Sequence, residues 1–163
     1  MNHSDTSRIE EDVIALLNDR NYTITCAESC TGGLLCATLV NVSGASNVLK
    51  SSLVTYAEEA KKELLGVRET TLEQFGVVSE ETASEMAKGA IRFAKADVSL
   101  SVTGVAGPGG GTKEKPVGLV CIGCCVKENT ETRTYIFKGD RLQIREQSVL
   151  KALELAKECI EKY

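Results

Sequence analysis

The sequence contains one histidine, His3, and it stands in a polar N-terminal segment that we expect to be disordered over residues 1–6. A Ser-His-Asp or Cys-His catalytic unit therefore cannot easily be built within one subunit. Any activated nucleophile in this chain needs a base other than histidine.

The sequence also has no stretch in which lysine and arginine are concentrated. Its 19 basic and 23 acidic residues give a formal net charge of −4. Nucleic-acid binding requires positive charge gathered along the phosphate backbone. We therefore expect no direct nucleic-acid ligand.

No apolar run approaches the roughly 20 residues that span a bilayer. The polar start, followed by Glu10, Glu11 and Asp12, lacks the basic and then apolar regions of a secretory signal. We expect a cytoplasmic protein with no membrane partner. In that compartment the seven cysteines are not expected to form a disulfide framework.

The CxxC spacing of Cys121 and Cys124 is the one cysteine pattern typical of a metal site. It lies in a strand-like segment and no second ligand pair accompanies it. Buried thiols are the favoured interpretation, and we expect no metal.

With 163 residues, 42% of them hydrophobic, the chain is predicted to form one domain over residues 1–163. Ser7 and Glu10 have the form of a capping box before a helix that ends near Asn21. Strands and helices then alternate, which predicts an α/β fold: a single layered domain with a mixed, mostly parallel sheet flanked by helices. Strands are predicted at 22–26, 52–56, 98–102, 117–126 and 132–137, and helices at 34–40, 58–65, from Ser79, and to the chain end.

The segment Ala27–Gly33 lies between a predicted strand and a predicted helix, where unpaired N–H groups and the helix dipole favour anion binding. Its glycines allow close backbone approach, and Ser29, Cys30 and Thr31 offer two hydroxyls and a thiol. A packed helix cap is an equally good interpretation. Residue type alone does not choose between them.

Two further segments are candidates for a site. Lys61, five residues after Tyr56, falls in the first turn of a helix that leaves a strand end, although an exposed lysine would fit the pattern too. The Gly-rich stretch Gly104–Gly111 could cradle a phosphate, but Gly110 stands where a P-loop requires lysine.

Together, several motifs resemble the CinA C-terminal family over nearly the whole chain. They are Thr25–Gly33 (TCAESCTGG), Val54–Lys61 (VTYAEEAK), Gly76–Ser79 (GVVS), Thr103–Gly111 (TGVAGPGGG), Lys115–Gly118 (KPVG), and Phe137–Arg141 (FKGDR) with Arg145. One departure is Gly109, where many relatives carry Asp.

The resemblance implies a nicotinamide mononucleotide deamidase that needs no cofactor, since members consisting of this domain alone are similar to such enzymes. Longer relatives add an N-terminal domain similar to molybdopterin-binding proteins. The family's Ser–Lys dyad maps onto Ser29 and Lys61, and Tyr56 is a candidate to orient the lysine. Substrate binding is expected from Cys30, Thr31, Gly32, Gly33, Thr103, Gly104 and Arg145.

This mechanism makes further demands on the site. A lysine base must titrate well below its ordinary value of about 10.4, so we expect a closed pocket. Backbone N–H groups of Ser29–Gly33 are expected to bind the oxyanion. Arg145 is preferred over Arg141 and Lys115 as the phosphate contact.

Two other functions remain open at this stage. One is a non-catalytic nucleotide-sensing or partner-binding module, because longer relatives are associated with competence and DNA damage. The other is an amidase for a different small amide. We expect a homo-oligomer, with a dimer preferred.

Overall fold

The computed structural model describes residues 8–163. The expected disorder of residues 1–6 and the capping role of Ser7 concern residues outside this range. Within it, α1 (Ile9–Arg20) begins after Arg8, whose N–H donates to the Glu11 carboxylate at 3.3 Å. The helix ends at Asn21 in the left-handed conformation.

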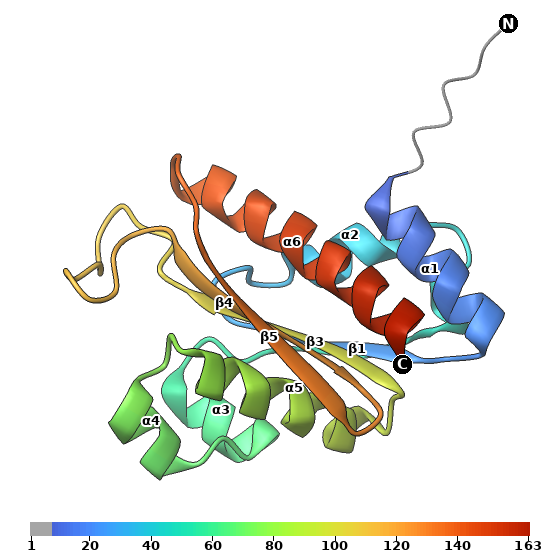
Figure 1. Ribbon diagram of the computed structural model, residues 1–163, viewed down its shortest axis with the longest axis horizontal. Helices are drawn as coiled ribbons and strands as arrows, with labels where there is room; N and C mark the ends of the chain where they lie inside the picture. The colour runs from blue at the N-terminus through green and yellow to red at the C-terminus, as the bar shows by residue number, and fades with distance from the viewer. Residues whose placement is uncertain (1–7) are drawn as a thin grey trace, which may run out of the picture.

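Helices and strands alternate over residues 9–65, after which two more helices, three consecutive strands and a C-terminal helix follow (Figure 1). After α1 they are β1 (Ile24–Glu28), α2 (Leu34–Val40), a 3₁₀ turn (Ala45–Asn47), β2 (Leu49–Val54), α3 (Glu58–Leu65), α4 (Glu69–Phe75), α5 (Glu80–Ala94), β3 (Val98–Gly104), β4 (Leu119–Val126), β5 (Asn129–Ile136) and α6 (Arg141–Lys162).

The five strands form one sheet in the order β2-β1-β3-β4-β5. Strand β1 is parallel to both β2 and β3, whereas β4 is antiparallel to β3 and β5. Four strands thus share a direction and β4 opposes them, which confirms a mixed α/β sheet. Helices α1, α2 and α6 cover one face, and α3, α4 and α5 lie on the other (Figure 1).

The pairing of β1 with β2 changes register once. Ile24 lies opposite Leu49, but the next residue, Thr25, lies opposite Ser51, so Lys50 is an extra residue in β2. From there the pairing is regular up to Glu28 and Val54. Glu28 also lies opposite Val102 of β3, so β1 and β2 end at the same level of the sheet, two residues before the end of β3.

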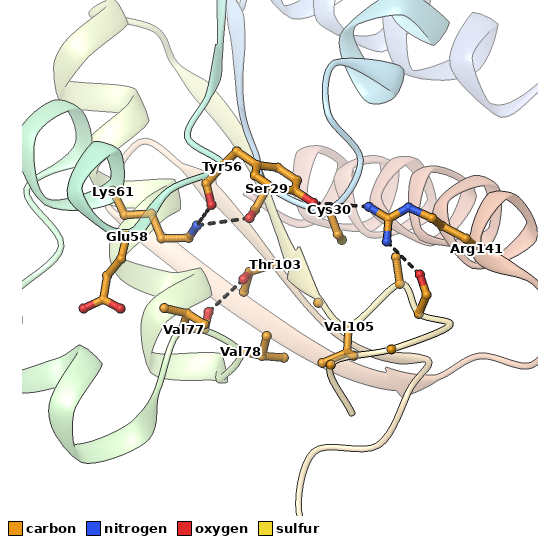
Figure 2. A pocket seen from close by; sticks show the side chains of 15 residues that line it. Ser29, Cys30, Tyr56, Glu58, Lys61, Val77, Val78, Thr103, Val105 and Arg141 are labelled. Carbon is orange, nitrogen blue, oxygen red and sulfur yellow. Dashed lines mark hydrogen bonds between the residues drawn. The ribbon is translucent and has the colours of Figure 1, made fainter. Parts of the chain in front are cut away.

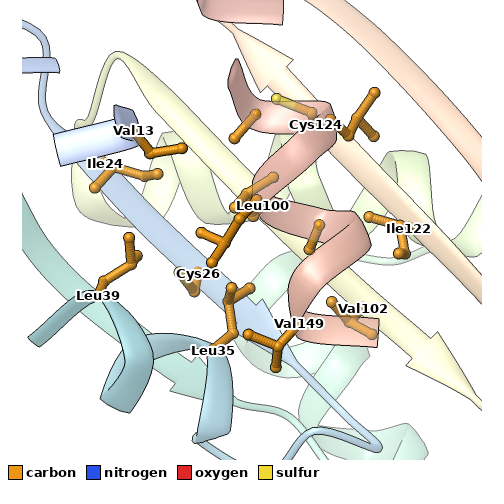
Figure 3. Packing of buried hydrophobic residues seen from close by; sticks show 14 of the residues in the cluster. Val13, Ile24, Cys26, Leu35, Leu39, Leu100, Val102, Ile122, Cys124 and Val149 are labelled. Atoms are coloured by element: carbon orange, nitrogen blue, oxygen red, sulfur yellow. The ribbon is translucent and has the colours of Figure 1, made fainter. Parts of the chain in front are cut away.

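The main core fills the space between the sheet and helices α1, α2 and α6 (Figure 3). On the other face, α5 packs on β3 through a fully buried side that includes Ala83, Ala87 and Ala90. Ser99 Oγ donates to the Ala87 carbonyl at 2.7 Å and Ser101 Oγ to the Ala83 carbonyl at 2.6 Å. This packing holds β3 against α5.

Cys121 and Cys124 lie in hydrophobic clusters on opposite faces of β4. Residues three apart in a strand point to opposite faces, so the CxxC spacing does not bring these thiols together. All seven cysteines are free thiols, as expected. Over residues 8–163 no group of three or more His, Cys, Asp or Glu side chains is placed to hold a metal ion. None of the helices in this range is long and apolar enough to cross a membrane.

Several predicted strand boundaries are wrong, among them those of β1, which runs over Ile24–Glu28 and not 22–26. Strand β2 runs over Leu49–Val54 and not 52–56, because the carbonyls of Thr55 and Tyr56 bind the Lys61 ammonium group and do not continue the sheet. The connection between β4 and β5 is also shorter than predicted, since it consists of residues 127–128 and not 127–130. Lys127 adopts a left-handed conformation with φ 55°, which allows a turn of two residues between Val126 and Asn129.

Candidate active site

The turn that carries Ser29 is fixed by the buried carboxylate of Glu28. Its Oε2 accepts from the N–H groups of Gly33 and Leu35, both at 3.0 Å, and its Oε1 accepts from the Cys36 N–H at 2.9 Å and from Ser52 Oγ at 3.2 Å. These are N–H groups that the start of α2 would otherwise leave unpaired. Glu28 therefore caps α2 and fixes the backbone on both sides of Ser29.

Lys61 is the fourth residue of α3, and it is 2% exposed although its side chain ends in an amine. Its Nζ lies 3.0 Å from Ser29 Oγ, 2.7 Å from the Thr55 carbonyl oxygen and 3.3 Å from the Tyr56 carbonyl oxygen (Figure 2). The Lys61 amine thus connects three parts of the fold: the end of β1, the segment that follows β2, and helix α3.

Burial lowers the pKa of Lys61 from its ordinary value, while the nearby Cys30 and Glu58 act in the opposite direction. Desolvation disfavours the charged form of a buried lysine. The direction is the one that a lysine base requires.

The three neighbours of Nζ also set where its lone pair points when the amine is neutral. A neutral amine has two N–H donors and one lone pair, and carbonyl oxygens can only accept. The two N–H groups then donate to Thr55 and Tyr56, which leaves the lone pair to accept from the Ser29 hydroxyl. The geometry suits proton transfer from Ser29 to Lys61.

Ser29 and Lys61 line a pocket of about 420 Å³ (Figure 2). Its walls come from the ends of β1 and β3, from α3, from the segment before α5, from the Gly-rich loop and from α6. The lining residues are Ser29, Cys30, Tyr56, Glu58, Lys61, Val77, Val78, Thr103, Gly104, Val105, Ala106, Gly107, Gly109, Gly110 and Arg141.

Four residues predicted to bind substrate do not line this pocket: Thr31, Gly32, Gly33 and Arg145. The Thr31 hydroxyl is buried and has no hydrogen-bond partner among residues 8–163. Cys30, Thr103 and Gly104 do line it, together with Ser29, Lys61 and Tyr56. The Thr103 hydroxyl donates to the Val77 carbonyl at 2.7 Å and so joins two walls of the pocket.

The Cys30 thiol is 6% exposed, and burial raises its pKa to about 11. A thiol is nucleophilic as the thiolate, which is scarce at neutral pH with such a pKa. The Ser29 hydroxyl, in contrast, has a base, Lys61, at hydrogen-bonding distance. Ser29 is the better nucleophile.

Only part of the Ser29–Gly33 backbone is available to bind an oxyanion. The Ser29 N–H donates to the Val102 carbonyl at 2.9 Å, and the Gly32 N–H donates to the Ser29 carbonyl at 3.0 Å. The Gly33 N–H is bound to Glu28. Within the described part of the chain, the N–H groups of Cys30 and Thr31 donate to no other residue.

The three cations considered for phosphate binding have different partners. Arg145 Nε donates to the Cys30 carbonyl at 3.0 Å and its Nη2 to the Thr31 carbonyl at 2.8 Å, behind the nucleophile turn. Lys115 Nζ donates to the carbonyls of Phe75 and Val78. Both side chains thus bind backbone.

Arg141 is the cation that reaches the pocket. Its Nη1 donates to the Gly107 carbonyl at 2.7 Å and its Nη2 to the Tyr56 hydroxyl at 3.2 Å (Figure 2). Of the three, Arg141 lines the pocket, whereas Arg145, the residue preferred from the sequence, does not. The Tyr56 carbonyl, and not its ring, is what contacts Lys61.

A family model described as the CinA C-terminal domain matches residues 6–160. A competence-damage inducible protein of Clostridium novyi is 48% identical over 155 residues, which are 94% of this chain and 37% of that protein. A relative of the same name from Caldicellulosiruptor bescii is 48% identical over 159 residues, which are 98% of this chain and 39% of that protein. The chain therefore spans less than two fifths of the length of these relatives.

Solved structures agree over the whole fold. A CinA superfamily protein from Klebsiella pneumoniae superposes with a TM-score of 0.91 at 33% identity, covering 95% of this chain and 97% of the other. The competence/damage inducible protein CihA from Agrobacterium tumefaciens gives 0.89 at 39% identity, covering 94% and 95%. The chain belongs to the CinA C-terminal domain family.

Proposed function

We propose that this protein is a nicotinamide-nucleotide amidase, which hydrolyses the carboxamide of nicotinamide mononucleotide to nicotinic acid mononucleotide and ammonia. The observation that carries the proposal is the buried Lys61 amine, 3.0 Å from Ser29 Oγ and oriented by two backbone carbonyls. A buried lysine without an ionic partner is costly in free energy. A catalytic role accounts for that cost.

In the first half of the reaction, Lys61 takes the proton of the Ser29 hydroxyl while Oγ attacks the carboxamide carbon. The N–H of Cys30, a residue that lines the pocket next to Ser29, is the donor that we assign to the oxyanion, and losing one such donor typically costs about 10²–10³ in rate. Lys61 then gives the proton to the amide nitrogen. The C–N bond breaks, ammonia leaves, and an ester to Ser29 remains.

In the second half, Lys61 takes a proton from water as the water oxygen attacks the ester carbon. The bond to Ser29 Oγ breaks, and Oγ recovers the proton from Lys61. The products are nicotinic acid mononucleotide and the free enzyme. One water is consumed for each ammonia released.

The phosphate end of the substrate is assigned to the Gly-rich loop and Arg141. Ala106, Gly107 and Gly109 line the pocket, and their N–H groups donate to no backbone acceptor within residues 8–163. Successive free N–H groups form concave anion sites. Arg141 adds a fixed positive charge beside them, since its Nη1 is bound to Gly107.

The first experiment measures ammonia release from nicotinamide mononucleotide by the purified protein and by Ser29→Ala, with no metal added. We expect turnover by the wild type and a loss of about 10³-fold or more in Ser29→Ala, because the nucleophile is removed. Ser46→Ala changes a serine that does not line the pocket and should retain full activity.

An inactive but folded wild type would refute the amidase. It would favour a non-catalytic nucleotide-sensing or partner-binding module, which calorimetry with the same nucleotide can detect. Equal turnover of nicotinamide riboside, which lacks the phosphate, would instead indicate an amidase for a different small amide.

The two arginines are expected to give different kinetic effects. Arg141→Met should raise KM for nicotinamide mononucleotide roughly 10–100-fold with little change in kcat, since charge-assisted hydrogen bonds contribute about 1.5–3 kcal/mol. The increase should disappear with nicotinamide riboside. Arg145→Met should instead lower kcat, because Arg145 fixes the two carbonyls that follow Ser29.

Steady-state kinetics with both substrates checks this prediction, and thermal unfolding of each variant shows whether it is folded. If Arg145→Met raised KM and Arg141→Met did not, the phosphate contact would be Arg145, as the sequence motifs indicate.

A further inference from the structure

The charged side chains of the pocket are arranged with opposite signs at opposite sides. Three charged residues line it: Glu58, Lys61 and Arg141. Figure 2 places Glu58 on the Lys61 side of Ser29 and Arg141 on the other side. With Lys61 neutral, as its proposed role requires, the dyad end of the pocket carries the Glu58 carboxylate and the loop end carries a guanidinium.

The proposed substrate, nicotinamide mononucleotide, also carries opposite charges at its two ends. Its pyridine ring is substituted at nitrogen and is a pyridinium cation, and this ring bears the carboxamide. The phosphate dianion lies at the far end of the ribose. A molecule with its carboxamide at Ser29 and its phosphate near Arg141 has its cationic ring nearer than its phosphate to the end of the pocket that Glu58 lines.

The ring of Tyr56 is a second feature of the pocket that suits a cation. The Tyr56 ring lines the pocket and is exposed, and Arg141 holds its hydroxyl at 3.2 Å. Aromatic faces attract cations, with about 0.5–1 kcal/mol at exposed sites. The walls between the two charges are apolar, formed by Val77, Val78 and Val105, which suits a flat ring.

We propose that Glu58 is a specificity residue, which makes the site prefer carboxamides on a cationic, N-substituted pyridinium ring over neutral rings of the same shape. The inference rests on the proposed function. Complementary charge in a binding site contributes to selection between partners. Glu58 is exposed, so water screens its charge and its contribution is moderate.

The bound cation has a further consequence for the base. A positive charge close to an amine disfavours the protonated form of that amine. A pyridinium ring placed against the dyad therefore favours neutral Lys61, the form that can accept the Ser29 proton. A neutral ring would lack this effect and would be the poorer substrate even where it binds.

The test compares two ligands that differ in ring charge and keep the same ribose phosphate. They are nicotinamide mononucleotide and its reduced form, whose dihydropyridine ring is neutral. Dissociation constants are measured by calorimetry on Ser29→Ala, which prevents turnover, with and without Glu58→Gln. The control is Glu59→Gln in the same Ser29→Ala protein, for which both dissociation constants are also measured. Glu59 is in the first turn of α3, as Glu58 is, but it does not line the pocket.

We expect Glu58→Gln to weaken binding of the oxidised nucleotide roughly 3–10-fold and to leave the reduced nucleotide within about twofold. The effect should shrink at high salt. Glu59→Gln should leave both constants unchanged. In protein that retains Ser29, KM for the oxidised form and the inhibition constant of the reduced form should show the same pattern.

Equal weakening of both ligands, or of neither, would overturn the role of Glu58 while leaving the amidase intact if the wild type releases ammonia. A wild type that releases no ammonia and binds neither nucleotide would refute the proposed function, and the inference with it.

Discussion

Lys61→Met is expected to lower kcat for ammonia release from nicotinamide mononucleotide by about 10³–10⁴-fold. The substitution keeps an unbranched side chain in a buried position but removes the only base within hydrogen-bonding distance of Ser29 Oγ among residues 8–163. General bases typically contribute about 10²–10⁴ in rate, and in the proposed mechanism the same group also protonates the departing ammonia.

Two control variants separate the base from its charge and from the fold. Lys61→Arg keeps a cation but cannot lose its proton, because the pKa of arginine lies above about 12, so it should be as inactive as Lys61→Met. Lys62→Met removes the neighbouring lysine, which pairs with Glu69 at 3.3 Å, and should retain activity. An active Lys61→Arg would contradict a base role for Lys61.

The pH profile of the wild type tests the same role without a mutation. Burial lowers the pKa of Lys61, and the neutral form is the one that the proposed mechanism requires. The value of kcat/KM should therefore rise with pH through that lowered pKa and level off above it. A rising limb centred at or above about 10.4, the ordinary value for lysine, would show that no depressed amine limits the reaction.

Glu28→Ala is expected to lower the free energy of unfolding by about 3–5 kcal/mol. The carboxylate is fully buried and accepts from three backbone N–H groups and one hydroxyl. Each buried donor left without an acceptor costs about 1–3 kcal/mol, although water entering the cavity would offset part of this loss. Urea denaturation followed by circular dichroism measures the change.

Glu28→Gln serves as the matched variant, since it keeps the volume and one acceptor oxygen and should lose less stability than Glu28→Ala. Glu59→Gln removes an exposed acidic residue and should change stability by no more than about 0.5 kcal/mol. A loss below about 1 kcal/mol in Glu28→Ala would mean that the start of α2 does not depend on this carboxylate.

The strands and long helices could be predicted because local sequence patterns indicate them. The short β-branched run before Cys26 and the Gly32–Gly33 pair predict the strand, the turn and the next helix. The spacing of small residues in α5 predicts a face that packs closely on a sheet, and Ala83, Ala87 and Ala90 are fully buried.

Helix α4 was not predicted, because distant segments hold it. The Arg68 N–H before the helix and the Thr71 hydroxyl within it both donate to Glu85 of α5 at 2.8 Å. At the other end, Lys115 binds the Phe75 carbonyl. Seven residues with so little apolar periodicity give no local signal for these partners.

The site was predictable only in part, for a similar reason. Residue types and spacing left Lys61 open to interpretation as an exposed side chain, and the family resemblance paired it with Ser29. Its position 3.0 Å from Ser29 depends on burial and on contacts between β1, β2 and α3. The role of Glu28 was missed, although an acidic residue just before a Gly-Gly helix start is a signal that could have indicated it.

The extra residue in β2 determines where the chain tolerates a change in length. Loss of Lys50 would leave Leu49 and Ser51 opposite Ile24 and Thr25, as an unbroken ladder would have them. No extra residue is available to absorb a deletion between Ser51 and Thr55. Such a deletion would shift Lys61 by about 3.3 Å along the strand direction and away from Ser29. Insertions and deletions among relatives should therefore be found before Ser51 and be absent from there to Lys61.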